Sequence, residues 1–313
     1  MSHVCGSDGD WVSAMRAGQF EQAWVVTDRD LAGCRWASGD KHLGPRHLQR
    51  IWRGEELRNR KVLVRCYHGL GDTIQFARFL APLAERVRTL TVWCQPELIP
   101  LIEPIEGVGR AIPLHDGTPD ADFEVDIEIM EIPHALRASR DLIELRKPYL
   151  TLPPRQGSEC IGRQRALAVG LVWEVGNWDK RRAIPARLLK GLRRDEIQLY
   201  SLQRNIPPGA PAQLGAKDIS TPDIVELGYR LRELDLLISV DTMVVHLAGA
   251  LGCEPWVMLH RDCDWRWPAH AGPSIWYPHA KLFYQRESGD WTHVIEGVSS
   301  ALARRAQQRA AGG

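Results

Sequence analysis

The hydrophobic positions of the first half of the chain alternate between two spacings. Runs of consecutive or alternating apolar residues predict strands at 61–66, 89–95 and 121–130. After the first strand, apolar residues such as Ile74 and Ala77 recur with helical spacing. Because strands that alternate with helices build a parallel sheet, this region predicts an α/β domain.

The same alternation returns after residue 165. Residues 148–165 are rich in proline, glycine and polar side chains, and we place the domain linker there. Beyond it the pattern predicts strands at 167–173, 197–202, 234–240 and 255–260, and helices at 222–232, 243–251 and 291–308. The chain therefore predicts two successive α/β halves, in which ligands bind beyond the carboxyl ends of the strands.

The first 58 residues have a different pattern. Apolar residues recur with helical spacing on both sides of Gly18, which predicts a helical hairpin over 8–33 that resembles one degenerate tetratricopeptide repeat. A single repeat cannot bury its own apolar face, so we expect it to dock on the neighbouring α/β domain. Residues 34–58 are polar and read as a connector. The expected organisation is a helical segment (1–58), an N-terminal Rossmann-like domain (59–150) and a C-terminal Rossmann-like domain (166–313).

Composition narrows the class of protein. With 313 residues, 44% apolar and 25% charged, the chain is that of a folded protein with two domains. The net charge is only +1, so the chain lacks the strong positive charge that is typical of nucleic-acid-binding proteins. The longest apolar stretch, 240–258, is interrupted by charged and polar residues, so no membrane span is expected. The seven cysteines show no CxxC spacing, which predicts free thiols. No secretory signal is seen, and together with the free thiols this predicts a cytoplasmic location.

The first candidate motif is the turn Gly69-Leu-Gly71-Asp72-Thr73, directly after a predicted strand. Glycines at such a turn allow another molecule to approach the backbone closely. The carboxylate of Asp72 has two interpretations: it projects beyond the strand into a ligand crevice, or it caps the next helix, a role that Thr73 can also take. A dinucleotide fingerprint requires a third glycine at position 74, where Ile74 stands.

The second motif surrounds the predicted helix 243–251. Thr242 is placed to cap its start and Gly252 to end it. The free N–H groups at a helix start attract an anion, and the side chain of His246 leans back toward the same point. A lone histidine on an apolar helix is usually a core residue, but Asp241, Thr242 and His246 converge here. Their convergence favours an anion-binding site.

A third motif, Trp173 to Pro185, contains the consecutive cations Lys180, Arg181 and Arg182 after a predicted strand. Charge runs are usually solvated, but the position at a strand's carboxyl end favours a phosphate clamp. The fourth motif, His260 to Pro268, combines tryptophans with Arg266, which suits either stacking on a sugar or base or simple packing. Asp262 and Asp264 lack further ligands at metal-binding spacing.

Together these motifs resemble glycosyltransferase family nine, the heptosyltransferases, in a bacterial branch associated with tetratricopeptide-like repeats. The resemblance covers about 61–298. It rests on four sequence segments, namely Gly-Leu-Gly71-Asp72, Gly170-Leu-Val-Trp173 with Gly176-Asn177, Asp241-Thr242 with His246-Leu-Ala-Gly-Ala-Leu-Gly252, and Asp264-Trp-Arg-Trp267 with the later tryptophans 276 and 291. It implies a GT-B fold, two Rossmann-like domains facing a cleft, and inversion at the anomeric carbon.

The resemblance also implies roles for individual residues. Asp72 corresponds to the catalytic base, and Arg182 to the cation that touches the donor phosphates. The segment with Asp241, Thr242 and His246 corresponds to the diphosphate-binding site. Many members of the family have glycine where this chain has Met243. The complete set of expected donor contacts is Gly71, Lys180, Arg182, Asp241, Thr242, Met243, Val244 and His246, with Gln203, His260, Trp265 and Trp267 as sugar or base contacts.

The sequence thus predicts an inverting, metal-independent glycosyltransferase that uses a nucleotide-diphosphate sugar, with an ADP-sugar favoured and no cofactor. The acceptor is a glycan, a lipid-linked molecule or a protein, and a peripheral contact with the inner membrane is a further expectation. Two alternatives stay open at this point. One is a non-catalytic nucleotide-sugar-binding or scaffold module, against which Asp72 argues because binding needs no base. The other is an NAD-type Rossmann enzyme, against which Ile74 argues.

Overall fold

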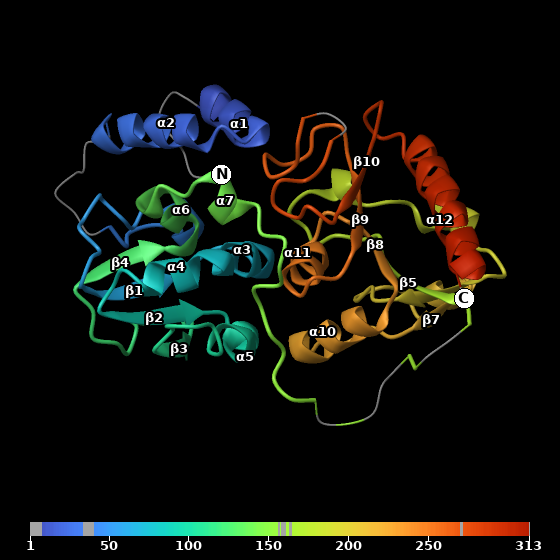
Figure 1. Cartoon of the computed structure of the whole chain (residues 1–313), viewed down its shortest axis with the longest axis horizontal. Helices are drawn as coiled ribbons and strands as arrows, with labels where there is room; N and C mark the ends of the chain where they lie inside the picture. The colour runs from blue at the N-terminus through green and yellow to red at the C-terminus, as the bar shows by residue number, and fades with distance from the viewer. Residues whose placement is uncertain are drawn as a thin grey trace. The chain divides into compact units, whose positions relative to one another are not determined.

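The computed structural model describes residues 8–33, 41–155, 157, 161–162, 165–269 and 272–312. These residues form two compact units (Figure 1). Unit 1 contains the described residues up to Pro153 together with the short segment Trp265–Ala269, and unit 2 contains the rest. The segment Trp265–Ala269 is therefore separated from the rest of its unit by more than a hundred residues of sequence.

Unit 1 is built on a parallel sheet of four strands in the order β3-β2-β1-β4. The strands are β1 (Lys61–Arg65), β2 (Thr89–Cys94), β3 (Arg110–Pro113) and β4 (Val125–Glu128). In this register Arg65 lies beside Trp93 on β2 and beside Glu128 on β4. The three predicted strands are confirmed, and β3 is an additional edge strand that the apolar pattern did not reveal.

The helices of unit 1 are short after the N-terminal pair. They are α1 (Asp8–Ala17), α2 (Phe20–Gly33), α3 (Leu70–Phe76), α4 (Leu80–Ala84), α5 (Ile99–Ile102), α6 (Ile132–Leu136) and α7 (Arg140–Ile143). The helical run after β1 changes to a 3-10 turn at Ala77–Phe79 before α4. Pro82 lies in α4 and has no N–H to bond the carbonyl four residues earlier, which explains why the run is not one regular helix.

The N-terminal hairpin forms as expected and docks on unit 1. Helices α1 and α2 lie side by side (Figure 1), joined at Gly18, which has a φ of 69°. The indole Nε1 of Trp24 donates to the carbonyl oxygen of Ala138 at 2.9 Å, and His134 Nε2 lies 2.9 Å from Asp28 Oδ1. Buried aromatic packing and this polar pair fix α2 against the segment around α6.

The described part of the polar connector, 41–58, is also held in place. The carboxylate of Glu131 accepts the backbone N–H groups of Ile51 and Trp52 at 3.1 and 2.9 Å. Lys41 Nζ lies 2.5 Å from Asp126 Oδ1 on β4. The connector is therefore an anchored cover of the unit 1 sheet, and its polar composition reflects contacts with buried charges on that sheet.

Unit 2 contains a parallel sheet of six strands in the order β10-β9-β8-β5-β6-β7. The strands are β5 (Leu167–Val172), β6 (Ile197–Ser201), β7 (Ala216–Asp218), β8 (Leu236–Val240), β9 (Pro255–Leu259) and β10 (Lys281–Tyr284). The four predicted strands are confirmed. The additional strands β7 and β10 are the two edges of the sheet and carry mostly exposed or half-buried side chains, so they lack a continuous apolar run.

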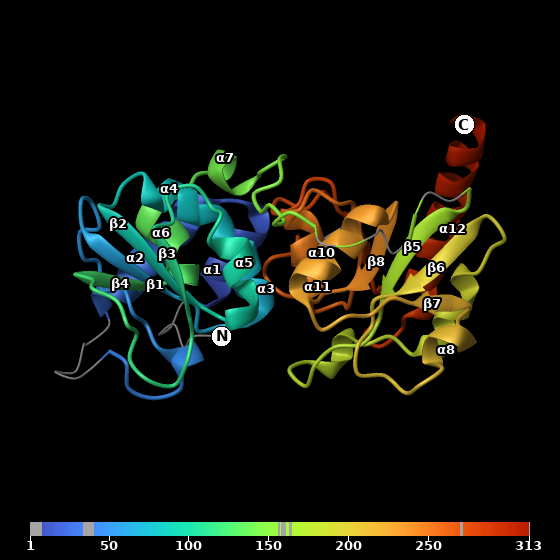
Figure 2. The ribbon, with the colours of Figure 1, turned by 90° about the horizontal axis from the view of Figure 1, so that it is seen from below.

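Helices cover both faces of the unit 2 sheet. They are α8 (Ala186–Leu189), α9 (Ala210–Gln213), α10 (Ile224–Glu233), α11 (Met243–Ala250) and α12 (Thr292–Gly312). Figure 2 shows α10 and α11 on one side of the sheet and α8 and α12 on the other. This doubly wound arrangement and the parallel sheet of unit 1 confirm the predicted α/β class.

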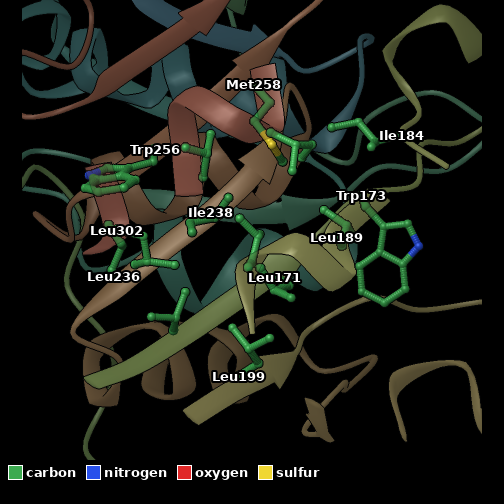
Figure 3. Packing of buried hydrophobic residues seen from close by; sticks show 14 of the residues in the cluster. Leu171, Trp173, Ile184, Leu189, Leu199, Leu236, Ile238, Trp256, Met258 and Leu302 are labelled. Carbon is green, nitrogen blue, oxygen red and sulfur yellow. The ribbon is translucent and has the colours of Figure 1, made fainter. Parts of the chain in front are cut away.

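The core of unit 2 lies between the sheet and the helices α8 and α12. Figure 3 shows Leu171, Ile238 and Met258, from three neighbouring strands, gathered in this cluster with Trp256 and Leu302. All five side chains are at most 3% exposed. Among the helices that the structure describes, none combines the length and the apolar character needed to cross a membrane.

Candidate functional site

The glycine turn after β1 places Asp72 at the start of α3, but not at the capping position. Gly69 is the residue that caps the helix, and Asp72 is its third helical residue. Asp72 Oδ2 accepts the N–H of Gly69 at 3.0 Å, which closes the first turn. Thr73, the other predicted cap, instead donates from Oγ1 to Gln95 Oε1 at 3.0 Å. The carboxylate thus supports the helix start and remains 28% exposed.

The second oxygen of Asp72 forms an ion pair with Arg266. This arginine belongs to the segment Trp265–Ala269, and its Nε donates to Gln75 Oε1 at 2.6 Å. Its guanidinium carbon lies 4.6 Å from the ring centroid of Trp265, and its side chain is only 10% exposed. Asp72 and Arg266 are 194 positions apart in the sequence, so no local pattern could have revealed the pair.

A histidine and a buried glutamate stand beside this pair. His68 lies in the loop before Gly69, and its Nδ1 is 3.0 Å from Oε1 of Glu128 at the end of β4. Burial alone would lower the pKa of His68, but the hydrogen bond and charge of Glu128, together with the charge of Asp72, outweigh burial and the opposing charge of Arg266, so the pKa is raised. The sequence pattern did not single out His68, although it lies within the glycine turn.

In unit 2, the second motif forms the expected helix start. Thr242 is the N-cap of α11 without a side-chain cap bond, and Gly252 follows the helix with a φ of 76°. His246 Nδ1 lies 2.9 Å from the hydroxyl of Tyr277, and its Nε2 is 3.9 Å from Asp241 Oδ1. Tyr277 therefore fixes the ring so that its second nitrogen faces Asp241 near the helix start.

The three consecutive cations form one 3-10 turn, Lys180–Arg182, but have different partners. Arg181 forms a bidentate pair with Asp179, and its hydrogen bonds hold the pKa of that carboxyl down at about 2. Arg182 Nη1 donates to the carbonyl oxygen of Asp241 at 2.9 Å. Lys180 Nζ donates to the carbonyl oxygen of Val175 at 3.1 Å. Of the three, Arg182 is the one that the structure brings to the start of α11.

Of the other predicted contacts in unit 2, Met243 and Val244 are the first two residues of α11, and Gln203 and His260 follow β6 and β9 and have partners of their own. Gln203 is buried, and its Oε1 accepts the N–H groups of Trp173 and Glu174 at 2.9 and 2.8 Å, so its amide holds a loop. His260 is 5% exposed, and its Nε2 lies 3.8 Å from Asp179 Oδ2. Burial lowers the pKa of His260.

Three further predicted contacts lie in unit 1. Gly71 is the second residue of α3. Trp267 is completely buried, and Trp265 is 9% exposed, with its ring centroid 4.9 Å from that of Trp11 and an interplanar angle of 70°. These two tryptophans therefore pack within unit 1. By contrast, Trp178 in the loop before Lys180 is 78% exposed, an aromatic surface that the sequence pattern did not single out.

Neither unit shows an obvious metal centre in its described part. Among the residues that the structure describes, no group of three or more histidine, cysteine, aspartate or glutamate side chains is arranged to hold a metal ion. Asp262 and Asp264, whose spacing resembles a metal-binding motif but for which no metal site is predicted, belong to those described residues. The positive charge near Asp241 comes from Arg182 and from the N–H groups of α11.

Comparison with known proteins gives matches of two kinds. No family model matches the chain. The protein FlbA of Caulobacter vibrioides is 24% identical over 331 aligned positions, which cover 91% of this chain and 54% of FlbA, so the chain spans about half the length of this curated relative.

Solved structures match at lower identity, but the overlap covers most of the other protein as well. A family 9 glycosyltransferase of Veillonella parvula superimposes with a TM-score of 0.52 at 11% identity, over 83% of this chain and 99% of that one. The ADP-heptose lipopolysaccharide heptosyltransferase II of E. coli gives 0.52 at 14% identity, over 78% and 99%. The iron-containing dodecameric glycosyltransferase TibC of enterotoxigenic E. coli gives 0.54 at 14% identity, over 81% and 78%. The chain therefore has the fold of family 9 glycosyltransferases, which confirms the predicted GT-B class.

Proposed function

We propose that the protein is a glycosyltransferase that takes a sugar from a nucleotide-diphosphate donor and inverts the anomeric carbon. The observation that carries the proposal is the convergence of Arg182, Asp241 and His246 at the start of α11. A helix start with an adjacent arginine and an imidazole matches the charge and hydrogen-bonding needs of a diphosphate. The fold shared with heptosyltransferases gives this anion site its enzymatic context.

Each unit has a separate chemical task in this proposal. Unit 2 is the donor domain: Arg182, assisted by Lys180 and by the N–H groups of Met243 and Val244, neutralises the charge of the leaving diphosphate. His246 and Thr242 donate hydrogen bonds to phosphate oxygens. Unit 1 is the acceptor domain, where the carboxylate of Asp72 drives the deprotonation of the acceptor hydroxyl. Because the protein itself supplies the positive charge, we propose that the transfer needs no divalent ion.

We further propose ADP-heptose as the donor. The support is the name of the similar E. coli enzyme, an ADP-heptose heptosyltransferase, together with the family motifs in this sequence. The acceptor is a glycan, a lipid-linked molecule or a protein hydroxyl, and the enzyme works in the cytoplasm or at the inner face of the membrane. We also propose that the hairpin α1–α2 is the tetratricopeptide-like segment expected in the bacterial branch of the family that this sequence resembles.

A thermal-shift panel of ADP, UDP, GDP, CDP and NAD tests the donor site without requiring an acceptor. A nucleoside diphosphate at about a hundred times its dissociation constant stabilises the folded state by roughly 2.7 kcal/mol. For domains of this size each kcal/mol raises Tm by about 2–4 °C. We expect ADP to give the largest rise, and Arg182→Ala and His246→Ala each to reduce it because each removes a hydrogen bond to phosphate.

A matched control is Arg181→Ala, because the guanidinium of Arg181 is committed to Asp179 and not to the start of α11. This variant should keep the full ADP shift. A rise in Tm with NAD alone would contradict the glycosyltransferase proposal. Equal ADP shifts for wild type, Arg182→Ala and His246→Ala would instead contradict our placement of the phosphates.

The non-catalytic binding module remains the second candidate because both oxygens of Asp72 already have partners, Gly69 and Arg266. The two candidates differ in turnover. A binding module takes up ADP-heptose but releases no ADP over hours, whereas a transferase releases ADP, slowly with water and faster once an acceptor hydroxyl is supplied. Coupled detection of ADP therefore separates the two.

A further inference from the structure

The loop between β1 and α3 is held rigidly from two sides. Directly after β2, the side chain of Gln95 donates through Nε2 to the carbonyl oxygen of His68 at 2.7 Å. From β4, Oε1 of Glu128 accepts the N–H of Tyr67 at 3.3 Å. Backbone and side chain of His68 are thus fixed by different strands. Such double anchoring gives a histidine one defined orientation, as a group that handles protons requires.

The hydrogen bonds of Glu128 determine which nitrogen of His68 carries the proton. Glu128 is 2% exposed, and its Oε2 accepts the N–H of Met130 at 2.7 Å, while its Oε1 accepts the N–H of Tyr67. A carboxylate surrounded by donors acts as an acceptor toward the imidazole as well, so Nδ1 of His68 carries the hydrogen. In the neutral ring the lone pair is then on Nε2. Among the described residues no group forms a hydrogen bond with Nε2, and the side chain is 20% exposed.

From this geometry we infer that Nε2 of His68 is the atom that takes the proton from the acceptor hydroxyl, and that Glu128 is its positioning residue. The inference rests on the proposed function and deepens it. A base oriented by a third group and open at its reactive atom is the recurring arrangement for activating a hydroxyl. Asp72, whose two oxygens bind Gly69 and Arg266, stabilises the imidazolium by its charge and does not itself receive the proton.

The step balances without any further reactant. The O–H bond of the acceptor breaks, and its proton moves to Nε2 of His68. The oxygen's electron pair forms the new bond to C1 of the sugar. The bond between C1 and the diphosphate oxygen breaks, and its electrons leave with the nucleoside diphosphate. The proton on His68 passes to solvent, to which the side chain is open.

The first test is the pH dependence of ADP release from ADP-heptose with water as acceptor. Only neutral His68 accepts a proton, so the wild-type rate should rise with pH through a pKa above the ordinary 6.5 of histidine, since Glu128 and Asp72 raise it against burial and Arg266. His68→Gln should lower kcat by roughly a hundredfold or more and abolish this rise, with little change in KM. Glu128→Gln should shift the rise to lower pH, because the raising charge is removed.

Imidazole added to His68→Gly provides the second readout, because rescue by a free base distinguishes a catalytic role from a structural one. The matched control is His134→Gln, which removes another histidine–carboxylate pair of unit 1, the one with Asp28. It should retain the wild-type pH profile. A wild-type profile in His68→Gln would overturn the inference and leave Asp72 as the base. Absence of ADP release from the wild type at every pH would instead overturn the proposed function, on which the inference depends.

Discussion

The two candidate sites are built in opposite ways. In unit 1, charged side chains are matched with one another: Asp72 with Arg266, and His68 with Glu128. In unit 2, the cations Lys180 and Arg182 donate their hydrogen bonds to backbone carbonyls, and the Asp241 carboxylate lies 3.9 Å from Arg182 Nη1 without a hydrogen bond to it. Matched side-chain pairs favour a group that changes its protonation state, whereas positive charge directed at backbone leaves a net attraction for an anion. The contrast supports a proton-transfer role for unit 1 and an anion-binding role for unit 2.

The most direct test of these different roles for the two units is Asp72→Asn, which keeps the shape of the side chain and removes its charge. We expect ADP release from ADP-heptose to fall by roughly tenfold or more, because the imidazolium that forms on His68 loses the negative charge that stabilises it. The ADP-induced rise in Tm should not change, since the phosphates are assigned to unit 2. Asp116→Asn, at an exposed position of unit 1, is the control. Near wild-type turnover in Asp72→Asn would remove this residue from the mechanism.

A substitution in unit 2, Gly249→Ala, should reduce the ADP-induced rise in Tm, which Asp72→Asn leaves unchanged. A Cβ added at Gly249 of α11 would lie 2.1 Å from a ring carbon of Tyr277, the residue that orients His246. Gly249→Ala should therefore displace Tyr277, destabilise the fold by about 1–3 kcal/mol and reduce the ADP shift. In α12, a Cβ at Gly297 meets Phe283 at an ordinary 3.6 Å, so Gly297→Ala serves as the control and should stabilise by about 0.5–1 kcal/mol. An unchanged ADP shift in Gly249→Ala would refute the role of Tyr277.

A smaller effect concerns how the folding stability of unit 1 depends on pH. Burial raises the pKa of Glu131 from its ordinary 4.5 to about 7, against the N–H groups of Trp52 and Glu128. Between these values the folded state holds a proton that the unfolded state lacks, so this group's contribution to stability is lost as pH rises from about 4.5 to 7. In Glu131→Gln that loss is absent, so the Tm of the variant relative to wild type should rise as pH increases from about 4.5 to 7. The exposed control Glu97→Gln should show a flat difference, and a flat difference in Glu131→Gln would be the contrary result.

The smallest expected effect concerns metal ions. Arg182 and the start of α11 provide the positive charge for the leaving group, so activity should survive excess EDTA. The measurement is ADP release before and after chelation, with Mg²⁺ or Mn²⁺ added back. Complete loss that either ion restores would show that unit 2 uses a cation after all, and Asp262→Asn and Asp264→Asn would then identify its ligands.

The parts of the fold that the sequence predicted are those with local signals. Central strands such as β5 and β8 are buried on both faces and read as continuous apolar runs, whereas the edge strand β7 has three residues of which two are exposed. The start of α11 was predictable because Thr242 and Gly252 mark the two ends of one helix. Helices as short as α5 and α9, of four residues each, carry no readable periodicity.

The same distinction applies to the candidate site. Asp241 and His246 are close in sequence and were predicted together, while the contact of Arg182 with Asp241 spans 59 positions and was expected only through the family resemblance. The His68–Glu128 pair spans 60 positions, and it depends on the register that places Glu128 next to β1. Tertiary pairing of this kind leaves no periodicity in the sequence, so it could not be foreseen.

The assignment of Trp265–Ala269 to unit 1 has a consequence for how the protein is made. During translation the first 153 residues leave the ribosome long before Arg266, the partner of Asp72, which lies 194 positions further along the chain. At about 5–20 residues per second, the 113 residues from Pro153 to Arg266 take about 6–23 s to synthesise. Unit 1 therefore begins to fold first but is completed only after most of unit 2 has been synthesised. A gene fragment that ends at the linker would encode a unit 1 that never acquires its arginine.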